Sequence, residues 1–294
     1  MSEFVEHKAY YAEAPLALVI GCGGLGTSVA RALGRRHPLL ICDLDRERLD
    51  RTIETLRQEG YVASGHGCDI TDPAQTKVLC EALATGPGVR VLAHVAAVGM
   101  SIRDWRKMMA VDLFGPHLIA EAVGPHMVRG GVAIFVSSLA SYLPPRDPRL
   151  EALLDDDPLR AGFLDELVKL LGAEPNFDDT YNYAKLGMNL LAERLAIKWG
   201  GKQVRALSLS PGMIDSPMAR AEGPTLPSHD GRQTRVPRSE KAREIPLGRQ
   251  GTLVEITNVV DFLASDQASF LNGIDIPVDG GHRAAWRARG VIQR

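Results

Sequence analysis

LALVIGCGGLGTSVARAL, residues 16–33, runs from a short apolar segment through a glycine-rich turn into a segment with helical spacing. The apolar run at 16–20 predicts a buried strand. Gly21, Gly23 and Gly26 follow it in the pattern GxGxxG. The first two glycines of this pattern allow a tight turn and a close approach of the backbone to a pyrophosphate, and the third allows the helix to pack closely on the strand. The stretch therefore predicts the first strand and helix of a dinucleotide-binding sheet.

The next apolar run, PLLICD, ends at Asp43, about twenty residues after the glycine turn. An acid at the end of the second strand accepts hydrogen bonds from the adenosine ribose and repels a 2′-phosphate, which favours NAD over NADP. Arg46 and Arg48 follow closely, and an arginine there can pair with a 2′-phosphate. We interpret both as solvent-exposed residues at the start of a charged helix over 45–59. NAD is therefore the expected cofactor and NADP the alternative.

The rest of the chain alternates apolar runs with helical segments, which is typical of a parallel sheet covered by helices on both faces. At 294 residues, a doubly wound α/β fold commonly forms one domain. The sequence therefore predicts a doubly wound α/β fold with a single domain over residues 1–294. Further strands are expected at 61–70, 89–97, 131–142, 202–212 and 273–281, and further helices at 101–128, 181–199 and 252–265.

YNYAK, residues 181–185, places Tyr181 and Lys185 four positions apart, so that a helix projects both side chains from one face. A free phenol has a pKa of about 10, and a fixed cation beside it lowers that pKa and makes proton transfer possible near neutral pH. Ser138 lies toward the carboxyl end of the predicted strand at 131–142, at the edge where parallel sheets bind ligands. A glycine turn, an acid, a serine and a Tyr–Lys pair in this order predict a proton-transfer site beside a bound dinucleotide.

These motifs resemble those of a short-chain dehydrogenase/reductase of the classical type, and the resemblance runs from about Leu16 to Gly281. GCGGLG resembles the family's TGxxxGxG, although it lacks the threonine and is one residue shorter. HVAA at 94–97 stands where NNAG is usual, and VDLFG at 111–115 stands where VNxxG is usual. The resemblance implies a Rossmann-type sheet of seven parallel strands, NAD(P), hydride transfer at a secondary alcohol or ketone, and a homotetramer or homodimer.

The resemblance also implies roles for individual residues. Ser138 would hydrogen-bond the substrate oxygen, Tyr181 would exchange the proton, and Lys185 would lower the pKa of the phenol while holding the nicotinamide ribose. Asp112 completes the expected catalytic set. The implied cofactor-binding residues are Gly21, Gly23, Gly24, Leu25, Gly26, Asp43, Leu44, Asp69, Ile70, Ala96, Ala97, Tyr181, Lys185, Pro211, Gly212, Ile214 and Ser216.

Three positions need separate interpretation. Asp112 stands in place of the asparagine that kinks a helix and leads protons to the lysine through water. An ionised aspartate accepts hydrogen bonds but cannot donate them, so the relay is expected to change. His94 also replaces an asparagine, and we interpret it as an anchor for neighbouring backbone. Asp69 matches the family's adenine-contacting acid, with capping of a helix that begins at Pro73 as an equal alternative.

Ser138 and Tyr181 lie 43 positions apart, farther than is usual in the family. The additional segment, 143–179, carries apolar residues at helical intervals and predicts two short amphipathic helices, with Asp157 as the cap and Pro158 as the first residue of the second. We expect them to wall an apolar substrate pocket; covering a dimer surface is the alternative. A similar insert occurs in relatives resembling 3α-hydroxysteroid dehydrogenase/carbonyl reductase, which suggests a hydrophobic or cyclic substrate of the steroid, terpene or aromatic type.

Composition narrows the class of partner. A formal net charge of −2 gives no global attraction for nucleic acid or an anionic membrane, so small-molecule substrates are expected. No apolar run is long enough to cross a bilayer, and we expect a soluble, cytoplasmic protein. The four cysteines lack close CxxC spacing and are expected to be reduced, and no metal site is expected. Residues 217–244, rich in proline, glycine, arginine and serine, are expected to form a mobile substrate flap.

The leading hypothesis is an oxidoreductase that transfers a hydride between NAD(H) and a secondary alcohol or ketone. One alternative, motivated by Asp112 and the HVAA segment, is an NAD(P)-binding protein with little or no turnover. Another is an NADP-dependent reductase of the 3-oxoacyl type. Enoyl reduction is disfavoured, because the family's enoyl reductases space their tyrosine and lysine more widely than YxxxK does.

Overall fold

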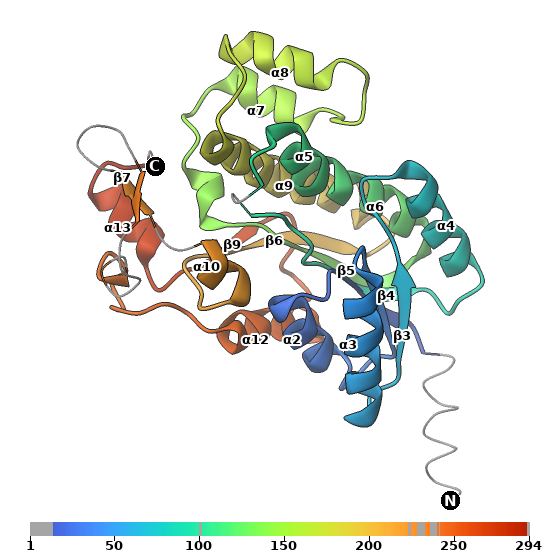
Figure 1. Ribbon diagram of the computed structural model, residues 1–294. Helices are drawn as coiled ribbons and strands as arrows, with labels where there is room; N and C mark the ends of the chain where they lie inside the picture. Colours follow the sequence, from blue (N-terminus) through green and yellow to red (C-terminus); the bar gives the residue numbers. More distant parts are fainter. Residues whose placement is uncertain are drawn as a thin grey trace, which may run out of the picture.

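The chain folds around a seven-stranded sheet in which every pair of neighbouring strands is parallel (Figure 1). The computed structural model describes residues 14–99, 102–222, 225–227, 233–235, 240 and 242–292. The strand order is β3-β2-β1-β4-β5-β6-β9. Their bounds are β1 Leu16–Ile20, β2 Leu39–Asp43, β3 Ala63–Gly67, β4 Val89–His94, β5 Met127–Val136, β6 Arg205–Pro211 and β9 Asp275–Val278. The predicted Rossmann-type, doubly wound α/β sheet in a single domain is confirmed.

Apolar residues alternate between the two faces of the sheet because successive side chains of a strand point in opposite directions. Val19 of β1 lies in a core shared with helices α2 (Gly24–Leu33), α3 (Arg46–Gln58) and α12 (Leu253–Leu263). Its neighbour Leu18 lies in the opposite core, shared with α4 (Pro73–Ala84), α6 (Gly115–Val123) and α9 (Phe177–Gly200). Both side chains are fully buried. The two cores fix the sheet between its helical layers.

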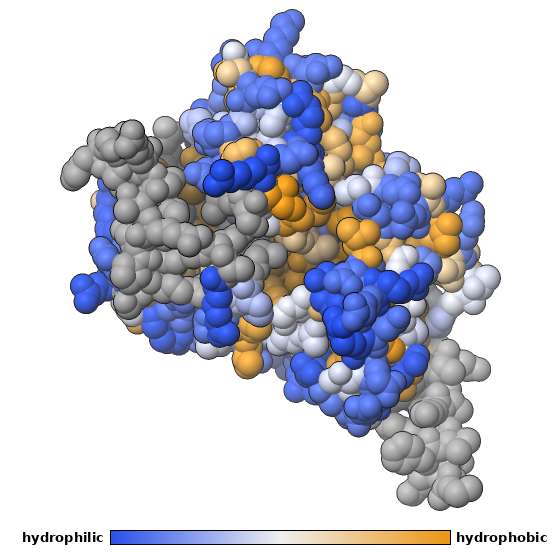
Figure 2. Space-filling view, viewed as in Figure 1, coloured by the Kyte–Doolittle hydropathy of each residue, from blue (hydrophilic) through white to orange (hydrophobic). Residues whose placement is uncertain are grey.

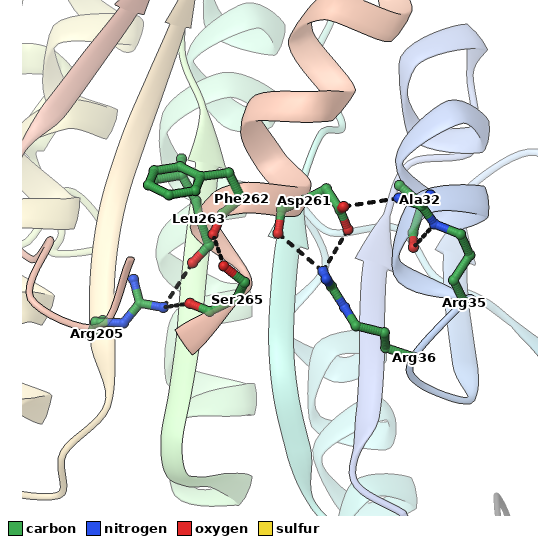
Figure 3. Close-up of polar contacts among 8 residues, drawn as sticks. All are labelled: Ala32, Arg35, Arg36, Arg205, Asp261, Phe262, Leu263 and Ser265. Carbon is green, nitrogen blue, oxygen red and sulfur yellow. Dashed lines mark hydrogen bonds and ion pairs between the residues drawn. The ribbon is translucent and has the colours of Figure 1, made fainter. Parts of the chain in front are cut away.

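At the edge of the sheet where the parallel strands begin, arginines form hydrogen bonds with the carboxyl-terminal end of α12 (Figure 3). Arg35 and Arg36, which follow α2, both bond the carboxylate of Asp261, at 2.9 and 2.5 Å. Arg205, the first residue of β6, donates to the carbonyl oxygen of Leu263 at 2.7 Å. A cation near a helix carboxyl terminus satisfies carbonyl groups that have no partner within the helix. These contacts stabilise the edge opposite the predicted site.

The additional segment forms the two expected helices, α7 (Pro148–Asp155) and α8 (Phe163–Leu171), which pack over α9 and α5 (Trp105–Met109) (Figure 1). The expected start of the second helix is wrong. Asp157 accepts from the amide of Leu159 at 2.9 Å within a turn, and α8 begins only after Gly162, whose φ of 82° lies in the left-handed region. Asp157 and Pro158 therefore mark a turn between the helices.

Other segments also differ from the expectations. β3 ends at Gly67, so Asp69 lies in the following turn. β5 begins at Met127 inside the expected helix and ends at Val136, and residues Leu139–Tyr142 form a 3-10 turn. The expected flap contains α10 (Pro217–Glu222) and an antiparallel pair, β7 (Thr225–Pro227) with β8 (Gln233–Arg235). Most of the remaining flap lies outside the described residues, and its role stays a prediction.

Candidate active site

The predicted site lies where the strand order reverses, between β1 and β4, which is the usual ligand crevice of an open α/β sheet. The glycine turn leaves β1 here, and the loop containing Ala96 and Ala97 leaves β4. The amide of Ala96 donates to the carbonyl of Ile20 at 2.7 Å. Gly21 has a φ of 94°, and a Cβ at this position would lie 2.8 Å from the Ala96 backbone. The two loops are therefore in direct contact, and glycine is required at residue 21.

The remaining glycines of the turn have different surroundings. A Cβ on Gly26 would lie 1.8 Å from the carbonyl oxygen of Gly21, so helix α2 packs against the turn at a distance that only glycine permits. A Cβ on Gly24 would lie 2.9 Å from Pro217, at the start of α10. A Cβ on Gly23 would meet no atom of the described residues within 4 Å. The open side of the turn is at Gly23, the N-cap of α2, where amide groups are available to a phosphate. The turn therefore fits a dinucleotide pyrophosphate.

This difference gives the first prediction. We expect Gly23→Ala to leave the thermal unfolding temperature within about 2 °C of wild type but to weaken dinucleotide binding at least about tenfold, because the added methyl group fills the space for the pyrophosphate. We expect Gly26→Ala, the matched variant, to lower the unfolding temperature by several degrees because its methyl group strikes backbone. Calorimetric titration and thermal unfolding measure both. Equal dinucleotide affinity in Gly23→Ala and wild type would contradict this assignment.

Asp43 joins the glycine turn to the end of β2. Its carboxylate accepts from the amide of Cys22 at 2.7 Å, from the amide of Asp45 at 2.9 Å and from the guanidinium of Arg48 at 2.7 Å. Burial alone would raise the pKa of this carboxyl, but these hydrogen bonds outweigh burial and lower it. Asp43 is therefore ionised at neutral pH, as an acceptor for ribose hydroxyls must be.

Arg46 and Arg48 are exposed at the start of α3, as interpreted, but the guanidinium of Arg48 also pairs with Asp43. The Arg48 side chain is 46% exposed and the Asp43 side chain only 6%, so the arginine is the partner that can move. Arg46 lies beside Gly67, where a Cβ would approach its guanidinium carbon to 2.8 Å. Arg48 therefore already contacts Asp43, the residue that would select between NAD and NADP.

The other predicted adenine-side residues lie at the ends of β2 and β3. Leu44 is 70% exposed, whereas Ile70 is only 7% exposed and packs against Gly115. The carboxylate of Asp69 accepts from the amide and hydroxyl of Thr71, at 2.9 and 2.7 Å. Helix α4 is capped instead by Asp72, which accepts from the amide of Ala74. The capping alternative for Asp69 is therefore wrong, and its adenine contact stays a prediction.

The loop after β6 is held at both ends. The amide of Gly212, next to Pro211, donates to the carbonyl of Val278 at 3.0 Å. Ile214 forms an isolated parallel bridge with Gly251. The hydroxyl of Ser216 accepts from the amide of Ala219 at 3.1 Å at the start of α10. The predicted nicotinamide-side residues therefore lie on an ordered loop at the carboxyl edge of the sheet.

Tyr181 and Lys185 lie on α9, whose N-cap Asn176 accepts from the amide of Asp179. Lys185 is only 1% exposed, and its Nζ lies 5.4 Å from the centre of the Tyr181 ring. The predicted pair is therefore brought together on one face of a helix. A buried ammonium close to a phenol favours the phenolate form, as the proposed proton transfer requires.

Lys185 also has an anionic neighbour, Asp112, the residue at the position of the family's relay asparagine. Its Nζ lies 3.7 Å from Oδ2 of Asp112, and the Asp112 side chain is fully buried. Asp112 lies in a π-helical turn, Ala110–Phe114, between α5 and α6, and its Oδ1 accepts from the amide of Val98 at 2.9 Å. Such turns inside helices are common at functional sites. The turn brings a carboxylate, rather than the family's usual amide, to the predicted catalytic lysine.

His94 is fully buried at the end of β4, and its ring stacks on Phe135 with a centroid separation of 5.9 Å. Neither ring nitrogen has a hydrogen-bond partner among the described residues. The interpretation of His94 as a backbone anchor is therefore wrong. Burial, followed by the charge of Lys185, lowers the pKa of His94 to about 3, so the imidazole is neutral at ordinary pH.

Ser138 lies between two residues, Ser137 and Ser141, that form hydrogen bonds with α9. The hydroxyl of Ser137 donates to the carbonyl of Lys185 at 3.0 Å, and the side-chain amide of Asn189 donates to the hydroxyl of Ser141 at 3.0 Å. The hydroxyl of Ser138 accepts from a backbone amide at 3.2 Å, which leaves its proton available for donation. Sequence reasoning missed Asn189, although a residue four positions after Lys185 continues the same helix face.

The apolar residues of the additional segment form a core with the neighbouring helices. Leu150, Leu154, Phe163 and Leu167 are buried in a core shared with α5, the π-helical turn and α9. A cavity of about 460 Å³ lies between the α7–α8 connection and α6, and none of the predicted site residues lines it. On the face shown in Figure 2, apolar side chains gather in the recess between α5 above and α2 and α3 below. That the segment walls a substrate pocket stays a prediction.

Cys22, Cys42, Cys68 and Cys80 all carry free thiols, as expected. Burial raises the pKa of the Cys22 thiol to about 11, with the neighbouring Asp43 as a further cause. No cluster of three or more potential metal ligands occurs within the described ranges. In the same part of the chain, no helix combines the length and apolar character needed to cross a membrane.

Comparison with known proteins gives consistent matches along the chain. A family model described as "short chain dehydrogenase" matches residues 15–146, and one described as "Enoyl-(Acyl carrier protein) reductase" matches residues 168–283. D-threitol dehydrogenase of Mycolicibacterium smegmatis is 27% identical over 91% of this chain and 92% of the relative. Cis-4-hydroxycyclohexanecarboxylate dehydrogenase of Sinomonas cyclohexanicum is 26% identical over 92% of this chain and 96% of the relative.

The fold is matched independently of these relatives. The crystal structure of gox2181 superposes with a TM-score of 0.71 at 23% identity and covers 92% of this chain and 96% of that one. The two chains therefore share the same overall fold along most of their length. The two family models, the relatives aligned along most of the chain and the shared fold lead to one identification: the chain belongs to the short-chain dehydrogenase/reductase family of oxidoreductases.

Proposed function

We propose that this oxidoreductase transfers a hydride between NAD(H) and a secondary alcohol or ketone. The observation that carries the proposal is the buried Lys185 ammonium 5.4 Å from the Tyr181 ring, on a helix to which the Ser138 segment is bonded. Burying an ammonium group costs free energy. A buried lysine beside a phenol is therefore a candidate functional group, here one that promotes proton transfer. The Gly23 side of the turn and the ionised Asp43 support a dinucleotide at the adjacent crevice.

The chain's own residues would move the proton. In the oxidation direction, the Tyr181 phenolate accepts the hydroxyl proton of the alcohol, and Ser138 donates a hydrogen bond to the same oxygen. Lys185 stabilises the phenolate through its positive charge. A bound nicotinamide supplies the hydride acceptor, and the glycine turn and the loop from Pro211 to Ser216 would orient it. In the reduction direction, Tyr181 returns the proton to the carbonyl oxygen.

We propose NAD as the preferred cofactor because the Asp43 carboxylate would repel a 2′-phosphate. Asp43→Asn should raise the ratio of kcat/KM for NADP to that for NAD at least about tenfold, since the repulsion is lost and Arg48 is freed to pair with the phosphate. Steady-state kinetics and NADPH titration measure the change. Adding Arg48→Ala to this variant should remove most of the gain. A ratio that Asp43→Asn leaves unchanged would contradict the assigned role of Asp43.

We propose a cyclic or polyhydroxylated alcohol as the substrate class. The two relatives named above are dehydrogenases of threitol and of a hydroxycyclohexanecarboxylate. The steroid-type or terpene-type substrate suggested by the additional segment has less support, because the apolar residues of that segment pack against α5 and α9. Polyols and substituted cyclohexanols are therefore the first compounds to test.

The homotetramer or homodimer implied by the resemblance also remains a proposal. Support comes from apolar residues beside the edge strand β9. Phe270 is fully exposed, Ile197 of α9 is 85% exposed and Ile274 is 39% exposed. An exposed apolar group beside a sheet edge is typical of a surface that another copy covers. Sedimentation of the purified protein measures the assembly.

The function is tested by incubating the protein with NAD and a panel of polyols and cyclohexanols while following the absorbance of reduced nicotinamide. The proposal expects turnover with at least one member of the panel and its loss in Tyr181→Phe. Tight dinucleotide binding without turnover across the alcohols and the corresponding ketones would favour the alternative of a binding protein. Full activity in Tyr181→Phe would contradict the catalytic assignment.

A further inference from the structure

We propose that Asp112 sets the pH range in which Tyr181 exchanges its proton, because its carboxylate offsets part of the Lys185 charge that stabilises the phenolate. The proposal deepens the proposed function and rests on it for its kinetic test. It assigns Asp112 as a positioning residue that acts through Lys185. The family's usual asparagine would carry no charge at this point.

The Lys185 ammonium lies close to both the Asp112 carboxylate and the Tyr181 ring. Oδ2 of Asp112 lies 3.7 Å from Nζ of Lys185, and that Nζ lies 5.4 Å from the centre of the Tyr181 ring. Asp112 and Lys185 are 0% and 1% exposed, so little solvent screens the charges. A lysine that faces both an anion and a phenol stabilises the phenolate less than a lysine that faces the phenol alone. The carboxylate also repels the phenolate directly.

The orientation of the carboxylate is fixed by the backbone. Oδ1 of Asp112 accepts from the amide of Val98 at 2.9 Å, in the loop that follows β4. The π-helical turn fixes the other end of the side chain. Asparagine can retain this hydrogen bond through its carbonyl oxygen, so Asp112→Asn removes the charge while keeping the shape.

His94, a further titratable group near Lys185, does not compensate. His94 comes from β4, and Lys185 and Tyr181 come from α9. The low pKa of His94, about 3 because of burial and then the Lys185 charge, keeps the imidazole neutral throughout the working range. His94 therefore neither cancels the Asp112 charge nor adds a titration of its own there. His94→Asn consequently serves as a control that changes a neighbouring buried side chain without changing charge.

The sign of the effect follows from these charges. Removing an anion near the phenol favours the phenolate, so Asp112→Asn should move the acidic limb of the pH–kcat/KM profile for alcohol oxidation to lower pH by about one unit. Asp112→Ser, a second neutral variant, should move it in the same direction. His94→Asn should leave the limb within about 0.3 unit of wild type, because no charge is changed. An unchanged limb in both Asp112 variants, or a move to higher pH, would overturn the proposal.

A second readout does not depend on turnover. The chain has six tyrosines, so the Tyr181 titration is isolated by subtracting the phenolate absorbance of the matching Tyr181→Phe protein. The midpoint should fall by about one unit between wild type and Asp112→Asn. A shifted midpoint in a protein that turns over no alcohol would uphold the role of Asp112 and reject the proposed function. An unshifted midpoint in an active enzyme would do the reverse.

Discussion

Tyr181→Phe is expected to lower kcat for alcohol oxidation by a factor of about 10² to 10⁴, because the phenylalanine ring keeps the shape of the side chain but cannot exchange a proton. Tyr181 is half-buried on α9, and the substitution removes only a hydroxyl. Dinucleotide affinity should therefore change by less than about threefold. Steady-state kinetics and calorimetric titration measure the two quantities separately.

Tyr183→Phe is the matched control for this substitution. Tyr183 lies two positions along the same helix, is buried in the core shared with the additional segment and belongs to no part of the predicted site. Its phenylalanine variant should retain kcat to within about threefold, since no proton transfer is assigned to it. Similar losses in both variants would mean that the effect of Tyr181→Phe is structural.

Lys185→Met is expected to abolish measurable turnover and to lower the free energy of unfolding by about 3–5 kcal/mol. The kinetic effect follows from removal of the cation beside the phenol. The effect on stability follows because the fully buried Asp112 carboxylate loses the charge that lies 3.7 Å away. Denaturant unfolding measures the stability and steady-state kinetics the activity.

The double variant Lys185→Met, Asp112→Asn separates these two effects. Neutralising the carboxylate should recover most of the lost stability but none of the activity, because the phenol still lacks its cation. If Lys185→Met alone were as stable as wild type, the buried ion pair would have no structural role. If the double variant regained activity, the assignment of Lys185 would be contradicted.

Much of this site is local in the sequence and could be predicted from it. Gly21, Gly23 and Gly26 fix the turn after the first strand, and Tyr181 and Lys185 share a helix face by spacing alone. Asp43 ends an apolar run about twenty residues after the turn, which is where its role requires it. These features depend on separations of a few residues or on strand ends, so the pattern of residue types is sufficient.

Features that depend on tertiary packing were not predicted. The resemblance linked Asp112 to the lysine through water, but the direct pairing of the two side chains across a π-helical turn was not predicted. The environment of His94 depends on its stacking against Phe135 of the neighbouring strand. The start of α8 was placed too early because Asp157 and Pro158 suit a helix start, whereas Gly162 in the left-handed region comes directly before the helix.

The pairing of Arg48 with Asp43 illustrates the same limit at the cofactor site. Both residues were singled out from the sequence, yet a charged residue at a helix start is usually solvated. The guanidinium of Arg48 reaches the carboxylate of Asp43 only because α3 lies beside the end of β2. The identity of the two groups was readable from the sequence, and their contact was not.

The most direct test of the central claim follows deuterium from the alcohol carbon. A substrate found in the panel is labelled at its carbinol carbon and oxidised in a single turnover with NAD, and the reduced cofactor is analysed by mass spectrometry. We expect one deuterium in the reduced nicotinamide of the wild type and release of the hydroxyl proton, with both events lost in Tyr181→Phe. Appearance of the label in water, or unchanged transfer in Tyr181→Phe, would contradict it.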